Sequence, residues 1–213
     1  MTLPEVIPFF PLPNVVFFPR MPLPLHVFEP RYRQMVRDAA AGPRLIGMVL
    51  LREGWQSDYQ GRPPVFGTGT VGEMVRSEEL PDGRFNIVLR GLREFTIARE
   101  LPPTAPSRKA TVRWRPAPDE SLAPGRRAGI ADGVHRWLAR LGQLAAAERL
   151  LSEPLDDETF VNFFAQQLDL SPIEKQALLE APGLTARADR LSDVIEFRLE
   201  ELRAVPTGGS RAQ

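Results

Sequence analysis

Proline crowds the first thirty residues of this chain. Eight of its 22 prolines lie there, at positions 4, 8, 11, 13, 19, 22, 24 and 30. Because proline lacks a backbone N–H and fixes φ, no helix can run through this stretch. Short apolar runs such as Val6–Ile7 and Val15–Phe18 separate the prolines. The segment is therefore expected to form short edge-type strands joined by turns.

Pro30 is the exception, because it can open a helix. The first helical position needs no N–H, and Gly42 followed by Pro43 provides an end. Four apolar residues between these points recur at helical spacing and predict one buried stripe: Tyr32, Met35, Val36 and Ala39.

From residue 44 to 117 the pattern changes to β. Leu45–Leu51 is an apolar run suited to a strand buried on both faces. A long loop over 52–64 follows, and Pro81-Asp82-Gly83 predicts a turn. The remaining strands are expected over 67–75, 85–89, 93–97 and 110–114, with a bend at Gly91.

A Pro/Gly-rich linker at 116–125 ends the β pattern. Helical periodicity then predicts helices over 126–142, from Asp156, from the capping box at Ser171, and over 185–203. The chain is thus expected to be α+β, with a β-rich lobe over 1–117, a helical lobe over 118–205 and a disordered tail over 206–213.

Composition excludes several classes of function. Cysteine is absent, so disulfides and thiolate chemistry are excluded. Residues 1–118 carry 16 basic and 11 acidic side chains, whereas residues 119–213 carry 11 and 16, and neither half has the dense basic run of a typical nucleic-acid binder. No apolar run is long enough to span a bilayer and no signal peptide is evident, so a cytoplasmic protein without a membrane partner is expected.

Catalytic motifs are missing as well. The chain's two lysines, Lys109 and Lys175, do not follow glycine, which excludes a phosphate-binding loop of the Walker A type. Glycines 67, 69 and 72 have dinucleotide-fingerprint spacing but precede no helix, and the two histidines, His26 and His135, do not form a metal-ligand pattern. No catalytic residue, cofactor or metal is therefore expected.

The remaining candidate for function is apolar. Large side chains occur where the backbone is expected to be irregular, in segment 17–23 and in the loop over 52–64. If exposed, they would form a patch for apolar peptide segments; if buried, they would fill the core of the β lobe. The candidate peptide-binding residues are Phe17, Phe18, Met21, Leu23, Trp55 and Tyr59.

The opening segment Phe10-Pro11-Leu12-Pro13-Asn14, continued through Val15-Val16-Phe17-Phe18-Pro19, resembles the start of the Lon protease N-terminal domain. Further blocks fit the same family: Leu23–Tyr32, Leu45–Met48 and Asn86–Phe95. The resemblance covers about residues 5–203. It implies a PUA-like β pseudo-barrel with one helix, followed by a helical bundle.

The resemblance further implies a stand-alone Lon-domain protein without the ATPase and Ser–Lys peptidase modules. Such a chain is expected to be a non-enzymatic polypeptide-binding or adaptor module, monomeric or weakly self-associating. Its expected partners are unfolded or apolar polypeptide segments, with a protease or chaperone as a further partner. Two alternatives stay open: an RNA-binding protein, since PUA-like barrels elsewhere bind RNA, and a small-molecule-binding protein.

Overall fold

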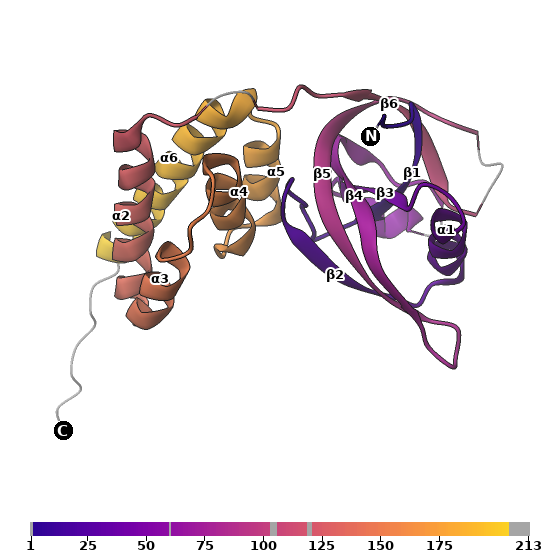
Figure 1. Ribbon diagram of the computed structural model, residues 1–213, viewed down its shortest axis with the longest axis horizontal. Helices are drawn as coiled ribbons and strands as arrows, with labels where there is room; N and C mark the ends of the chain where they lie inside the picture. The colour runs from indigo at the N-terminus through magenta and orange to yellow at the C-terminus, as the bar shows by residue number, and fades with distance from the viewer. Residues whose placement is uncertain (1, 60, 103–105, 119–120, 205–213) are drawn as a thin grey trace. The chain divides into compact units, whose positions relative to one another are not determined.

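The computed structural model describes residues 2–59, 61–102, 106–118 and 121–204 and has the expected α+β composition (Figure 1). The strands are β1 (Val6–Leu12), β2 (Pro22–Val27), β3 (Leu45–Leu51), β4 (Val65–Glu79), β5 (Phe85–Glu100) and β6 (Arg108–Trp114). The helices are α1 (Pro30–Ala40), the 3-10 turn η1 (Trp55–Asp58), α2 (Pro124–Arg140), α3 (Leu144–Leu151), α4 (Asp157–Gln167), α5 (Pro172–Leu179) and α6 (Gly183–Ala204). None of the described helices combines the length and apolarity needed to cross a membrane.

The six strands form one mixed sheet in the order β2-β5-β4-β3-β1-β6, and a further pairing joins β5 to β6. That pairing closes five of the strands into a ring (Figure 1). β2 pairs with the first part of β5, and β6 pairs with its last part. The pairing of β1 with β3 is parallel, and the others are antiparallel. Where the sequence predicted two strands separated by a bend, β5 is a single strand, and its pairing with β4 shifts register between Arg93 and Gly91.

The core of the sheet lies inside this ring. Every residue of β3 is buried, which confirms the prediction of a strand covered on both faces. Side chains from five strands meet there in one cluster that includes Ile7, Phe9, Val49, Val71, Phe95 and Val112. The α1 helix begins at Pro30 and buries the predicted stripe, and its Tyr32 ring stacks on Phe10 of β1 at 4.0 Å between centroids.

The segment between β1 and β2 belongs to the core and is not an exposed patch. Phe17, Phe18 and Met21 are 1%, 0% and 3% exposed, so the hypothesis that they bind peptides on the surface is wrong. Backbone contacts fix the segment against β5: the Arg20 amide donates to the Gly91 carbonyl, and the Gly91 amide donates to the Met21 carbonyl, both at 2.9 Å. The irregular backbone suggested that these side chains are exposed. The free energy gained by burying them explains why they lie in the core instead.

Gly91 permits this approach because it has no side chain. A Cβ at this position would lie 2.3 Å from the carbonyl oxygen of Phe18, closer than two such atoms can approach. Glycine therefore marks a close contact between two segments of backbone here. It does not mark a break in the strand.

The chain forms two compact units. One comprises residues 1–117 together with 162–180, and the other residues 118–161 together with 181–213. This differs from the predicted helical lobe over 118–205, because the second half of α4 and all of α5 pack with the sheet. The predicted tail over 206–213 lies outside the described residues.

Polar side chains on residues 162–180 attach this segment to the sheet unit. The buried Asn162 donates through Nδ2 to the Pro19 carbonyl at 3.1 Å, and Gln166 donates through Nε2 to the Pro22 carbonyl at 3.1 Å. Gln176 donates in the same way to the Thr68 carbonyl at 3.1 Å. Each of these amides thus donates to a backbone carbonyl of the sheet unit.

The second unit is helical. Its ion pairs include Arg127 with Asp157 at 2.7 Å and Arg126 with Asp189 at 2.6 Å. The hydrogen bond from Arg127 to the Asp157 carboxylate is the main reason that the pKa of Asp157 lies below its usual value. The α3 helix was not predicted from the sequence. Gln143, at its N-cap position, makes no side-chain cap hydrogen bond.

We predict that Phe18→Ala lowers the free energy of unfolding by about 3–5 kcal/mol, the range for a fully buried phenylalanine. Phe28→Ala serves as the matched control, because Phe28 is 60% exposed and its loss should change stability by no more than about 0.5 kcal/mol. Urea denaturation measures both values. Equal stability of the two variants would contradict the burial of the 17–21 segment.

Candidate functional site

The six residues proposed from the sequence do not form one surface. With Phe17, Phe18 and Met21 in the core, the remaining three are half-buried. Leu23 lies on β2 opposite Leu89 of β5. Trp55 and Tyr59 lie together on the β3–β4 connection, and this connection is the part of the hypothesis that still describes an accessible site.

A 3-10 turn brings Trp55 and Tyr59 into contact. Gly54 precedes the turn with a φ of +83°, a left-handed conformation that glycine adopts without steric strain. The Trp55 and Tyr59 rings then meet edge to face, with 5.4 Å between centroids. This geometry is favourable for two aromatic rings and stiffens the connection.

Residues at the start of α1 hold Tyr59 in place. The Tyr59 hydroxyl donates a hydrogen bond to the Glu29 carboxylate. Arg31 donates through Nε to the same carboxylate and through a terminal nitrogen to the Tyr59 carbonyl, each at 3.1 Å. Burial and the Glu29 hydrogen bond raise the pKa of Tyr59 above its usual value, with burial the larger cause.

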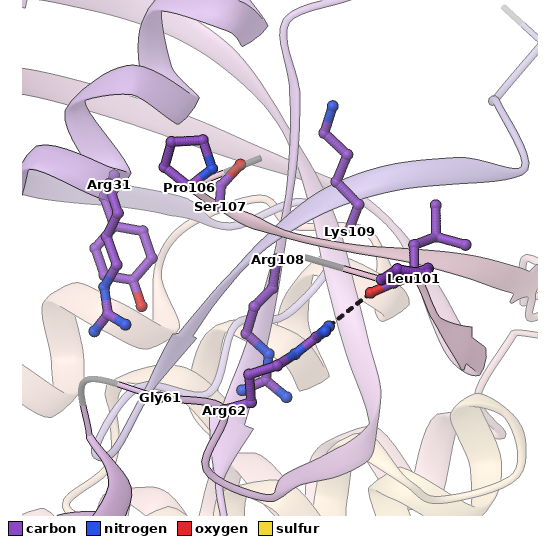
Figure 2. A pocket seen from close by; sticks show the side chains of 10 residues that line it. Arg31, Gly61, Arg62, Leu101, Pro106, Ser107, Arg108 and Lys109 are labelled. Atoms are coloured by element: carbon purple, nitrogen blue, oxygen red, sulfur yellow. Dashed lines mark hydrogen bonds between the residues drawn. The ribbon is translucent and has the colours of Figure 1, made fainter. Parts of the chain in front are cut away.

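A pocket of about 330 Å³ opens beside this connection (Figure 2). It lies where the first turn of α1, residues 61–62, residues 101–102 and residues 106–109 come together, all within the sheet unit. None of the described residues that line it has an acidic side chain. The polar side chains of the lining are Arg31, Tyr32, Arg62, Ser107, Arg108 and Lys109.

Two guanidinium groups of the lining share one carboxylate. Arg108 binds Glu100 through two nitrogens, at 3.1 and 2.5 Å, and Arg62 binds the same carboxylate at 2.9 Å. Arg62 also donates to the Leu101 carbonyl at 2.8 Å, the dashed line in Figure 2. In that view Lys109 points away from Arg62 and Arg108. The two arginines are thus fixed in position, and their shared carboxylate neutralises one of their two charges.

Two hydroxyl-bearing residues with little exposed surface also line the pocket. Tyr32 is 2% exposed and Ser107 is 6% exposed, and neither hydroxyl has a hydrogen-bond partner among the described residues. Burial raises the pKa of Tyr32 to about 12, against the opposing charges of Arg31 and Arg108. The Tyr32 hydroxyl therefore stays protonated at neutral pH and is available as a donor.

Sequence reasoning missed most of this pocket. The arginines at 31, 62 and 108 lie far apart in the chain, and no motif connects them. The one available signal was the position of Arg62 within the loop that contains Tyr59. Across the described residues, no three histidine, aspartate or glutamate side chains lie close enough together to hold a metal ion.

Comparison with known proteins matches most of the chain to one family model. A family model described as the ATP-dependent protease La (LON) substrate-binding domain matches residues 6–196. The Lon protease of Parabacteroides distasonis is 31% identical over 208 residues, which cover 94% of this chain and 25% of that protein. Lon protease 2 of Myxococcus xanthus is 29% identical over 208 residues, which cover 94% of this chain and 24% of that protein. The chain therefore spans about a quarter of the length of these relatives.

Solved structures agree on the fold. The Lon N-terminal domain protein from Xanthomonas campestris superposes with a TM-score of 0.62 at 24% identity, covering 94% of this chain and 98% of that one. The N-terminal domain of the Mycobacterium avium complex Lon protease gives a TM-score of 0.64 at 18% identity, with coverages of 90% and 98%. At these identities the likeness concerns the fold alone.

The two tyrosines provide a test of the site's environment. We predict that Tyr59→Phe leaves one tyrosine that ionises near pH 12, because Tyr32 is buried. The folded-state pKa of Tyr32 lies above the unfolded value of about 10. The contribution of Tyr32 to stability is therefore fully present below a pH of about 10. This contribution is lost as the pH rises toward 12.

Tyrosinate absorbance followed with pH measures the ionisation, and circular dichroism at each pH reports whether the chain is still folded. A midpoint near pH 10 in the folded variant would contradict the burial of Tyr32.

Proposed function

We propose a function from one premise: the chain belongs to the Lon substrate-binding domain family. In our proposal it is a non-enzymatic module that binds polypeptide, either as a receptor or as an adaptor that delivers a client to another protein. The match of the substrate-binding model to residues 6–196 is the observation that carries this proposal. We further propose that the closed sheet is a PUA-like pseudo-barrel.

The surface best suited to this role is the connection that contains Trp55 and Tyr59, together with the adjoining pocket. Trp55 is half-buried, so part of its apolar ring is still available to a ligand. The contacts of Tyr59 with Glu29 and Arg31 fix the connection before a ligand arrives, which lowers the entropic cost of binding. A ring presented on a fixed turn can anchor one apolar side chain of a client.

The proposal assigns no reaction to these residues. The family match is to the substrate-binding domain, and the two lysines at 109 and 175 lack the glycine-rich context of a phosphate loop. We propose unfolded or apolar polypeptide segments in the cytoplasm as clients, with a protease or chaperone as the protein that receives them.

We predict that the chain binds an unfolded polypeptide with micromolar or weaker affinity, because one or two small anchors must offset the ordering of a flexible chain. The ligand is a disulfide-bonded test protein, used native and after reduction and carbamidomethylation, which adds no charge. Fluorescence anisotropy is expected to detect binding of the unfolded form only. Equal binding of both forms, or of neither, would contradict the proposed function.

Trp55→Ala is expected to weaken this binding about fivefold or more, since burying the rest of the ring contributes about 1 kcal/mol. Phe197→Ala is the matched control, because Phe197 is a 58% exposed aromatic residue on α6. Unchanged affinity in a folded Trp55→Ala variant would show that polypeptide does not bind at this connection.

A further inference from the structure

The described lining of this pocket presents hydrogen-bond donors and no acidic side chain. Its arginines donate only, and the Tyr32 and Ser107 hydroxyls lack partners among the described residues. Neither hydroxyl oxygen is a fully buried atom without a partner, so both are open to the pocket and free to donate. Two open donors beside guanidinium groups suit a ligand that supplies acceptor oxygens.

The balance of charge limits what that ligand can be. Glu100 is shared by Arg62 and Arg108, so this pair keeps one positive charge that the carboxylate does not neutralise. Arg62 uses one of its three guanidinium nitrogens in its described hydrogen bonds, which leaves two for a ligand. Lys109 adds a second charge to the lining but points away from both arginines in Figure 2. The one positive charge of the arginine pair suits a monoanion, and the planar fork of arginine matches a carboxylate.

The rest of the lining indicates what accompanies the charge. Leu101, Pro102 and Pro106 form an apolar part of the wall. A volume of about 330 Å³ lies at the lower end of the range for small-molecule pockets, which is about 300–1,000 Å³. The space therefore suits an apolar side chain beside one carboxylate and not a longer segment.

We propose that this pocket binds a carboxylate group of the client polypeptide, either its free C-terminus or an aspartate or glutamate side chain. This inference rests on the proposed function and adds to it the chemical class that the site selects. Arg62 and Tyr32 contact the carboxylate, and Leu101 and the two prolines contact the neighbouring apolar group. The connection that carries Trp55 and Tyr59 also supplies Gly61 and Arg62 to the pocket, and it receives the next part of the client.

The first experiment uses the full chain and two small probes, N-acetylleucine and its uncharged amide, N-acetylleucinamide. Heteronuclear NMR titration at neutral pH is expected to show saturable shifts with the acid and at least about tenfold weaker binding of the amide, the effect of a hydrogen bond to a charged group. Equal binding of the acid and the amide, or no saturable binding of either, would overturn the proposal.

Two variants and a control test the named residues. Arg62→Gln removes the charge, and Tyr32→Phe removes only the hydroxyl and keeps the ring that stacks on Phe10. Each is expected to weaken binding of the acid about tenfold and to leave binding of the amide unchanged. Arg113→Gln removes the same charge from an exposed position on β6 that does not line the pocket, and it is expected to bind like the unaltered chain.

A thermal melt of each variant confirms that it is folded before the titration. If folded Arg62→Gln and folded Tyr32→Phe both bind the acid as the unaltered chain does, the proposal is wrong. The same conclusion follows if Arg113→Gln weakens binding as much as Arg62→Gln, because the effect would then be general attraction to positive charge.

Short peptides distinguish the two sources of the carboxylate. A leucine-ending pentapeptide is compared as its free acid, as its amide, and as an amide with an internal Glu or Gln. Binding of the free acid assigns the C-terminus, and binding of the Glu peptide assigns an acidic side chain; either supports the proposal. Binding of the amide and Gln peptides at the level of the acids overturns it.

The same measurements separate the inference from the function on which it rests. If the short acids bind but the unfolded test protein does not, the carboxylate site stands and the receptor function fails. If the unfolded protein binds while the acids show no preference over the amides, the receptor function stands and the carboxylate site fails.

Discussion

The pairing of β5 with three other strands is the constraint on which the sheet unit depends. Its 16 residues pair with β2 at one end, with β6 at the other and with β4 along most of their length. A strand of this length spans roughly 50 Å, far more than the mean strand, and it must bend to serve both ends. The pairing with β6 closes the ring, and the close approach at Gly91 lets the Phe17–Met21 segment cover the core beside it.

The candidate site follows from the same closure. Glu100 is the last residue of β5 and Arg108 the first of β6, so the pairing that closes the ring also brings their side chains together. Arg62 then joins this carboxylate from the β3–β4 connection. The first turn of α1 supplies Arg31 and Tyr32. The pocket is therefore built at the end of the ring from side chains of α1, β6 and the connections between the strands.

Regular patterns in the sequence predicted the elements well, because local physics determines them. The start of α1 at Pro30, the full burial of Leu45–Leu51 and the capping box at Ser171 were all predicted and are all present. Each depends on residues within a few positions of one another.

The predictions that failed concern features that depend on contacts between residues far apart in the chain. Proline and irregular backbone around Phe17 and Phe18 suggested exposure, whereas contacts with Gly91 and with the buried Asn162, more than 70 residues away, place the segment in the core. The grouping of residues 162–180 with the sheet likewise depends on Gln166 and Gln176 reaching carbonyl groups that no local pattern reveals. The pocket was missed for the same reason, since its donors come from three separate segments.

Hydrogen–deuterium exchange of the full chain, with and without the unfolded test protein, tests the central claim most directly. If these residues receive a polypeptide, added protection is expected in the peptides that cover residues 52–64 and 101–109, and the Trp55→Ala variant is expected to lose it. Protection confined to other segments, or none at a concentration that saturates binding, would contradict the assignment of the site.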